Sequence, residues 1–177
     1  MDVFISGDRV NLVVLTEEAA FTSPWASWFN DQETTASMQQ HHFPTTRAMQ
    51  VQFFQNELSA NSTKLQLGIQ CRQTATFIGI ISLSRIDWIS RRSEIAVTIG
   101  NPEFRSLDYW LEANALLIDH AFTSLNLHRI TGGSIRREVA DLYVRLLDFA
   151  HEGIYREHAY KNGKYVDCYL FGRLATD

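Results

Sequence analysis

The hydrophobic positions in the first part of the chain change from a strand-like to a helix-like spacing. Residues 9–16 (RVNLVVLT) are apolar and β-branched, which predicts a strand. Thr16 and the two glutamates after it have the composition of a helix start with Thr16 as N-cap, and the stretch to Asp31 is expected to be mainly helical. Thr45 or Thr46 should begin another helix, because apolar residues recur along one face of it. That face consists of Met49, Phe53, Phe54 and Leu58.

Strand patterns fill the middle of the chain. Residues 64–71 and 75–89 predict two strands joined by a short polar turn, and residues 93–100 predict a third. Because neighbouring side chains on a strand point to opposite faces, the third strand has one apolar face and one more polar face. The first face carries Ile95, Val97 and Ile99, and the second carries Glu94, Ala96 and Thr98.

The C-terminal half alternates helices with strands. A helix is expected over residues 108–124, a strand over 129–135 and a second helix over 138–147. Asn162-Gly163 is a dipeptide typical of tight hairpin turns, and it predicts that the chain ends in two paired strands.

The order of these elements indicates the fold class. The strand–helix–strand unit over residues 93–135 should make its two strands parallel, because crossover connections normally do, and the other strands should be antiparallel. We therefore predict a single α/β domain over residues 1–177, with a mixed central sheet of about seven strands and helices on both faces.

Composition excludes several classes of protein. The 177 residues are 45% hydrophobic and 20% charged with a net charge of -4, and no basic tract indicates nucleic-acid binding. The small acidic balance favours amine-bearing partners only slightly. No export signal and no apolar run of membrane-spanning length are visible, and no spacing of metal ligands stands out. Cys71 and Cys168 are then expected to be reduced thiols of a cytoplasmic protein.

Three blocks of the C-terminal half resemble the GNAT superfamily of N-acetyltransferases, and most closely the branch that acetylates the N-termini of ribosomal proteins. The first block is residues 94–104 (EIAVTIGNPEF). The second comprises Glu112-Ala113, residues 116–122 and residues 125–130 (LNLHRI). The third comprises Phe149, Glu152-Gly153, Arg156-Glu157, Gly163, Tyr165, Asp167, Tyr169, Gly172 and Leu174. The resemblance implies the GNAT fold, acetyl-CoA as acyl donor, and a primary amine on a small molecule or protein N-terminus as acceptor.

The family's pyrophosphate loop, (Q/R)-x-x-G-x-(G/A), corresponds here to residues 105–110 (RSLDYW). Its glycines let backbone amides at a helix N-terminus approach the phosphates. Asp108 and Trp110 stand at the glycine positions, where a carboxylate would repel a pyrophosphate and an indole would crowd it. The alternative, which we favour for Asp108, is that it is the helix N-cap. The resemblance implies cofactor contacts from this loop by Arg105, Ser106, Asp108, Tyr109 and Trp110.

The resemblance implies further cofactor contacts outside this loop. The backbone of Val97, Thr98 and Ile99 would contact the pantetheine arm, because family members leave that strand edge open. Arg137 stands where the family usually has asparagine, and it could hold a phosphate or a carboxylate. The alternative for Arg137 is a solvated surface arginine.

Two residues are candidates for proton transfer. Glu94 could accept the proton of the amine through water while a backbone N–H of the central strand stabilises the oxyanion, as the resemblance implies. Tyr143 lies near the tyrosine position of the family, but that position corresponds to Val144, about 100° away around a helix. A core role for Tyr143 is therefore the favoured interpretation. The alternative for Glu94 is a structural ion pair with one of three arginines, Arg91, Arg92 or Arg129.

The acceptor pocket and the non-catalytic alternatives complete the sequence hypotheses. His41 and His42 lie where family members shape the acceptor pocket, and exposed loop histidines are the alternative interpretation. One rival function is a degenerate relative that binds without catalysis. Another is an interaction protein whose N-terminal aromatic residues form the face of a homodimer, although Trp25 and Trp28 are most simply core. Those aromatic residues are Phe21, Trp25, Trp28, Phe29, Phe53 and Phe54.

Overall fold

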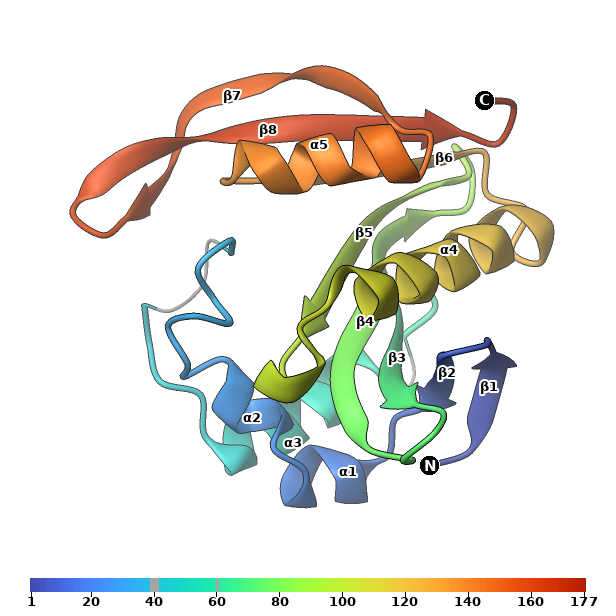
Figure 1. The fold of residues 1–177 in the computed structure, drawn as a ribbon, viewed down its shortest axis with the longest axis vertical. Helices are drawn as coiled ribbons and strands as arrows, with labels where there is room; N and C mark the ends of the chain where they lie inside the picture. Colours follow the sequence, from blue (N-terminus) through green and yellow to red (C-terminus); the bar gives the residue numbers. More distant parts are fainter. Residues whose placement is uncertain (39–41, 60) are drawn as a thin grey trace.

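The computed structural model describes residues 1–38, 42–59 and 61–177. Its strands are β1 (Val3–Ser6), β2 (Val10–Val14), β3 (Leu65–Cys71), β4 (Phe77–Asp87), β5 (Arg92–Ile99), β6 (Arg129–Ser134), β7 (Ala150–Lys161) and β8 (Lys164–Leu174). Its helices are α1 (Glu17–Thr22), α2 (Trp25–Trp28), α3 (Arg47–Glu57), the short 3-10 turn η1 (Pro102–Phe104), α4 (Leu107–Thr123) and α5 (Arg137–Leu146). Figure 1 shows their arrangement.

The described strands form one mixed sheet in the order β1-β2-β3-β4-β5-β6-β8-β7. The parallel pairing of β5 with β6 confirms the crossover prediction, and the remaining neighbours in this order pair antiparallel, also as predicted. The sheet has eight strands where about seven were expected. The additional strand is β1, whose four residues are too few and too exposed for an alternating pattern to show.

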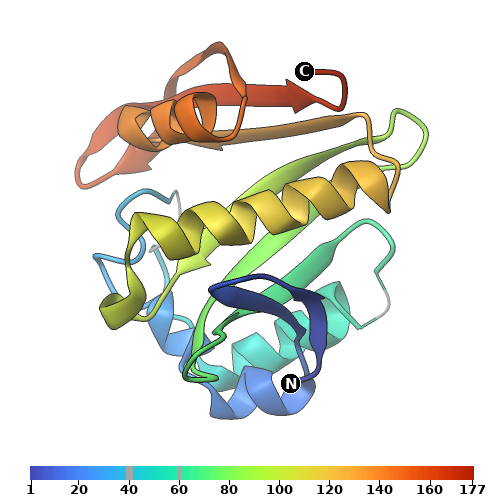
Figure 2. The same ribbon diagram turned by 45° about the vertical axis from the view of Figure 1, so that its right-hand side comes forward.

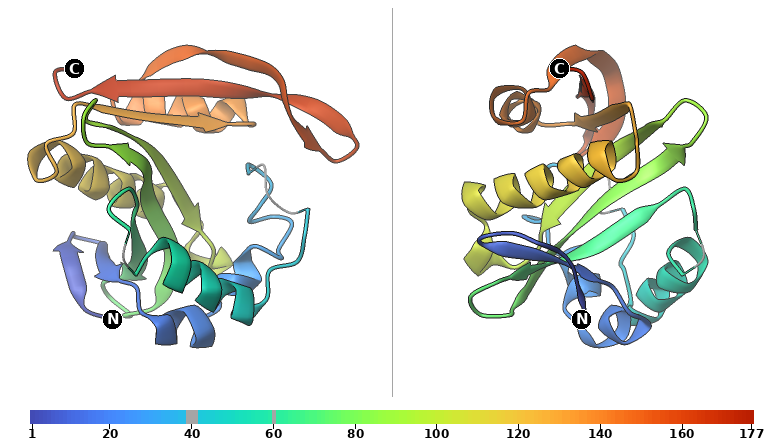
Figure 3. Two further views of the ribbon diagram at one scale, coloured as in Figure 1. Left: turned by 180° about the vertical axis from the view of Figure 1, so that it is seen from behind. Right: turned by 90° about the vertical axis from the view of Figure 1, so that its right-hand side faces the viewer.

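Helices cover both faces of the sheet, as predicted (Figure 2 and Figure 3). Helices α4 and α5 lie on one face, and α1, α2 and α3 lie on the other. Thr16 and Thr46 are the N-caps of α1 and α3, accepting hydrogen bonds from the third residue after each. The stretch expected to be mainly helical up to Asp31 contains two short helices that are separated at Ser23-Pro24, because proline has no N–H to continue the helical hydrogen bonds.

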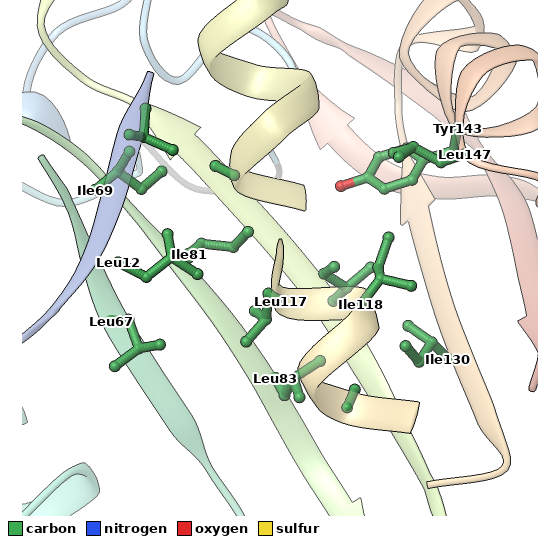
Figure 4. Packing of buried hydrophobic residues seen from close by; sticks show 14 of the residues in the cluster. Leu12, Leu67, Ile69, Ile81, Leu83, Leu117, Ile118, Ile130, Tyr143 and Leu147 are labelled. Carbon is green, nitrogen blue, oxygen red and sulfur yellow. The ribbon is translucent and has the colours of Figure 1, made fainter. Parts of the chain in front are cut away.

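The larger hydrophobic core lies between the sheet and α4 (Figure 4). Leu117 and Ile118 of α4 are fully buried in it. The apolar face predicted for β5 belongs to this core, since Ile95 is buried there and Val97 and Ile99 pack against it. Burial of such apolar surface is the main stabilising contribution to the fold.

A second core on the opposite face contains most of the N-terminal aromatic side chains. Trp25 and Trp28 are buried in it, and Phe29, Phe53 and Phe54 pack around them. The two tryptophans are therefore core residues, in agreement with the simplest interpretation, and a homodimer face at the partly buried phenylalanines stays a prediction. Phe21 is 54% exposed, and Met49, which was predicted on the apolar face of α3, is 49% exposed.

The C-terminal hairpin has the predicted turn. Asn162 and Gly163 both have positive φ, 51° and 82°, as a type I′ turn requires. Cys71 and Cys168 are free thiols and both are buried. Within the described part of the chain, none of the helices combines the length and hydrophobicity that crossing a membrane requires.

Candidate functional site

Strands β5 and β6 are paired at one end and part at the other. Arg92, Ser93 and Glu94 pair with residues 129–131, and beyond Glu94 the two strands diverge (Figure 1 and Figure 3). A gap therefore opens in the middle of the sheet, with the rest of β5 bordering it.

The backbone of β5 presents unpaired hydrogen-bonding groups to this gap. Gly100 N–H donates to the carbonyl of Ile78 at 2.9 Å, so Gly100 and the alternate residue Thr98 direct their polar backbone groups toward β4. The N–H and C=O groups of Val97 and Ile99 consequently face the gap. This is the open strand edge that the sequence resemblance implies for the pantetheine arm.

A cavity of about 1320 Å³ passes through the gap and reaches both faces of the sheet. On the α4 and α5 side it is lined by Ser106, Leu107, Trp110, Val139, Leu142 and Tyr143. On the opposite side its polar and charged lining includes Lys64, Ser82, Ser84, Glu94, Arg129, Glu152 and His158. The cavity thus connects the N-terminus of α4 with the polar face of β5.

The N-terminus of α4 offers backbone donors to this cavity. Ser106 is the N-cap with an extended backbone, and its side chain makes no capping hydrogen bond within the described chain. The N–H groups of the first turn, from Leu107 to Tyr109, have no acceptor inside the helix. They are available to an anion, which the positive end of the helix dipole also favours.

Asp108 and Tyr109 direct their side chains elsewhere. The N-cap prediction for Asp108 is wrong, because it is the second residue of α4. Its carboxylate lies 3.6 Å from Arg9 Nη1, and neither side chain is among the described residues that line the cavity. The Tyr109 ring packs against Phe104, and its hydroxyl is 3.9 Å from Cys71 Sγ.

Trp110 lines the cavity without closing it. Its ring meets the Tyr143 ring edge-on, with 4.8 Å between the ring centroids, so the indole lies between α4 and α5. The cavity contacts Ser106 on one side of Trp110 and reaches Val97 on β5. The indole narrows this space, and the turn before α4 still communicates with the parted strands.

Arg105 is engaged by the segment that follows α2. Its Nη2 lies 3.0 Å from Asp31 Oδ2 and 2.6 Å from Thr34 Oγ1, and its Nη1 lies 2.8 Å from Glu33 Oε2. Hydrogen bonds from Thr34, and then from Arg105, lower the pKa of Asp31 to about 2. Arg105 therefore connects residues 31–34 to the loop before α4. The carboxylates of Asp31 and Glu33 neutralise its positive charge.

Arg137 is at the other end of the candidate cofactor side. It is the first residue of α5, its side chain is 69% exposed, and its Nε lies 4.0 Å from Asp141 Oδ2 in an i,i+4 pair. It is not among the described residues that line the cavity. Binding of a phosphate by Arg137 stays a prediction from the sequence.

Glu94 lies at the point where β5 and β6 part, with its side chain 45% exposed and lining the cavity. Its Oε1 accepts a hydrogen bond from Arg85 Nη1 at 2.9 Å. The ion pair of Glu94 is therefore formed with Arg85, which is not one of the three arginines proposed from the sequence. Those three have other partners: Arg91 bonds Asn126, Arg92 pairs with Asp87 and Arg129 pairs with Glu152.

Tyr143 is a core residue in the structure. It is 3% exposed, and burial raises the pKa of its hydroxyl group. Its hydroxyl donates to Asn114 Oδ1 at 2.8 Å, and its ring stacks on Phe171 with 4.2 Å between centroids. Figure 4 shows it reaching from α5 toward α4. The placement agrees with the favoured core interpretation, and a role in proton transfer stays a prediction.

The two interpretations of Tyr143 give different results for Tyr143→Phe. We expect the free energy of unfolding to fall by about 1–3 kcal/mol, because Asn114 Oδ1 loses its donor in a buried place, and kcat to change only a few-fold. Urea unfolding and initial rates measure the two effects. Tyr160→Phe, at an exposed tyrosine that is not among the described cavity-lining residues, is the matched control. A hundredfold loss of kcat without loss of stability would instead identify a proton donor.

The histidines predicted for the acceptor pocket are only partly visible. His41 lies outside the described residues, and His42 is exposed and not among the described cavity-lining residues. The structure instead brings His158 and Tyr155 of β7 to the cavity, with 5.2 Å between their ring centroids. Only long-range pairing of the hairpin places them there, so no local pattern marks them. The described residues contain no cluster of three or more side chains suited to a metal ion.

Comparison with known proteins agrees with this geometry. Residues 9–136 match the acetyltransferase (GNAT) domain. The uncharacterized N-acetyltransferase p20 of Bacillus licheniformis is 29% identical over 123 residues, which are 69% of this chain and 68% of that protein. Spermidine N-acetyltransferase from Vibrio cholerae, solved with CoA and spermine, has a TM-score of 0.85 at 19% identity, covering 96% of this chain and 98% of its own. A GNAT-family acetyltransferase from Bacillus anthracis has a TM-score of 0.80 at 15% identity, covering 98% and 99%.

Proposed function

Because this chain belongs to the GNAT family of acetyltransferases, we propose that it transfers the acetyl group of acetyl-CoA to a primary amine. The observation that carries this proposal is the continuous cavity through the parted strands. It joins backbone donors at the start of α4 to the carboxylate of Glu94 on the other side of the sheet. An acyl donor on one side and an amine on the other could therefore meet at the gap.

The residues present fit acetyl-CoA in two respects and depart from the family pattern in a third. The free backbone edge at Val97 and Ile99 suits an extended arm, and the first turn of α4 suits a diphosphate. The departure is the absence of loop glycines, but the Asp108 side chain is directed to Arg9 and the indole of Trp110 leaves the cavity continuous. Acetyl-CoA supplies the activated acetyl group, and the chain supplies its orientation.

The proposed roles of the chain in catalysis follow from the same placement. Glu94, on the acceptor side of the gap, takes the proton of the attacking amine through a water molecule. Arg85 keeps the Glu94 carboxylate oriented by its hydrogen bond of 2.9 Å. A backbone N–H of Val97 or Ile99 is the donor proposed for the acetyl oxygen as it gains negative charge.

The branch of the family and the kind of acceptor amine are also part of the proposal. The three matched sequence blocks favour the branch that acetylates ribosomal-protein N-termini, whereas a protein of similar fold is named for spermidine. A protein N-terminus and a small-molecule amine are both primary amines that the cavity could admit. A homodimer and a cytoplasmic location remain predictions from the sequence.

Binding of acetyl-CoA through the first turn of α4 can be tested by removing one backbone donor. Leu107→Pro deletes the N–H of the first helical residue, a position where proline is tolerated, and the extended Ser106 before it suits a following proline. We expect this variant to bind acetyl-CoA about tenfold more weakly, since hydrogen bonds to charged groups contribute about 1.5–3 kcal/mol. Isothermal titration calorimetry measures the affinity.

The control for this experiment is Leu107→Ala, which removes the same side chain and keeps the N–H. We expect the alanine variant to bind nearly as the parent chain does. The parent chain should also gain about 2.7 kcal/mol of stability at acetyl-CoA concentrations a hundred times the Kd. The proposal fails if millimolar acetyl-CoA gives no thermal shift, and the role of the helix terminus fails if the two variants bind equally.

A further inference from the structure

The carboxylates that line the cavity are already matched by arginines. In the described part of the lining, each glutamate has a guanidinium group within ion-pair distance. These pairs are Glu94 with Arg85 at 2.9 Å, Glu33 with Arg105 at 2.8 Å, and Glu152 with Arg129. An acceptor with several ammonium groups would have to compete with these guanidinium groups for the carboxylates.

Lys64 is the remaining lysine or arginine of the described lining. Among the described residues, no carboxylate lies within 4.0 Å of its ammonium group, which instead lies 4.4 Å from the centre of the Phe53 ring. Burial also lowers the pKa of Lys64, because it disfavours the charged form. The negative charge of Glu57, which is not within ion-pair distance, acts in the opposite direction and raises the pKa of Lys64. A partly buried ammonium with no carboxylate in direct contact is stabilised when an anion binds beside it.

Sheet register places Lys64 in line with Glu94. Leu65 pairs with Leu83, so Lys64 lies beside Ser84, and Ser84 pairs with Glu94 on the next strand. The three side chains share the face of the sheet that borders the acceptor side of the cavity. Lys64 and Glu94 are therefore two strand spacings apart, about 10 Å between backbones, with a serine between them.

We propose that the acceptor is a compact primary amine that also carries an anionic group, a carboxylate or a phosphate, and that Lys64 binds this group while the amine lies beside Glu94. This inference rests on the proposed acetyl transfer for the role of Glu94. It separates this chain from an enzyme selective for polyamines, because the cavity offers a cation where a second ammonium group of a polyamine would lie.

Four probes with the same aminopropyl segment test the inference. They end in a carboxylate, a phosphonate, an ammonium group or a methyl group: 4-aminobutyrate, 3-aminopropylphosphonate, 1,4-diaminobutane and butylamine. Calorimetry measures their binding, and thiol release from acetyl-CoA measures kcat/KM. We expect the two anionic probes to have an affinity and a kcat/KM about tenfold or more above those of butylamine. Diaminobutane should have the lowest values.

Lys64→Met keeps the aliphatic contact with Phe53 and removes the charge. We expect this variant to lose the preference for the anionic probes, about tenfold or more in affinity and kcat/KM. The affinity and kcat/KM for butylamine should be unchanged. Lys64→Arg should restore most of that advantage, which a purely structural lysine would not require. Lys164→Met, at an exposed position beside the hairpin turn, is the matched control and should leave all four probes unchanged.

The outcomes separate this inference from the proposed function. Binding of the anionic probes that depends on Lys64, without thiol release, supports the anion site and contradicts acetyl transfer to these amines. Diaminobutane used or bound as well as 4-aminobutyrate overturns the inference, as does an unchanged preference in Lys64→Met or a lack of binding by both anionic probes. A preference for the phosphonate over the carboxylate identifies phosphate as the natural anion, and the reverse identifies carboxylate.

Discussion

Replacing Glu94 with glutamine is expected to lower kcat by about 10²–10⁴-fold with the best amine acceptor, the range typical of a lost general base. Glutamine has nearly the same shape and can still accept a hydrogen bond from Arg85, so the local structure should be kept. It cannot take the proton that the amine must lose. Initial rates at saturating acetyl-CoA measure the effect, and the affinity for acetyl-CoA should be unchanged.

The structural interpretation of Glu94 gives the opposite pattern. If the carboxylate only holds Arg85, Glu94→Gln should keep most of its kcat, and Arg85→Gln should have an effect of similar size. In the proposed mechanism, Arg85→Gln leaves the base in place and should lower kcat much less than Glu94→Gln. Glu157→Gln, an exposed glutamate of β7, is the control for loss of a charge.

Phe171→Ala is expected to lower the free energy of unfolding by about 3–5 kcal/mol, as large-to-small changes of buried aromatics do. Phe171 is 2% exposed, stacks on Tyr143 and meets Phe149 edge-on with 5.5 Å between centroids. Loss of the Phe171 ring leaves a cavity between α5 and strand β8 of the sheet. Urea-induced unfolding measures the change.

The control for Phe171 is Tyr165→Ala, at a side chain on the same strand that is 65% exposed. We expect Tyr165→Ala to change the free energy of unfolding by less than about 0.5 kcal/mol. A similar, small effect of both substitutions would mean that this aromatic cluster does not hold α5 in place.

The parts of the fold that could be predicted depend on local periodicity and on chain connectivity. Hydrophobic spacing marked strands β2 to β6 and helices α4 and α5 to within two residues at their ends, and the Asn162-Gly163 dipeptide marked the hairpin. The crossover rule then predicted that β5 and β6 are parallel, and the structure pairs them as neighbours. The assignment of Val97 and Ile99 to an open strand edge came from the family resemblance and not from periodicity or connectivity.

The rest of the site depends on contacts between residues far apart in the chain. Arg85 lies at a bulge of β4 with a φ of 52°, and nothing in its local sequence indicates that it reaches Glu94. Arg105 was expected to contact the cofactor, and its hydrogen bond with Asp31, 74 residues away in the chain, could not be predicted from the local sequence. Asp108 follows common N-cap preferences, yet the N-cap of α4 is Ser106, two residues earlier.

The parting of β5 from β6 also has a consequence for how the sheet is completed. Beyond Glu94, one side of β5 has polar backbone groups with which none of the described strands pairs, so that solvent satisfies them in the free protein. A pantetheine arm, which carries amides of its own, would lie there as an additional strand does in a sheet. Cosubstrate capture would then supply the missing backbone partner, and each departing CoA would return that strand edge to water.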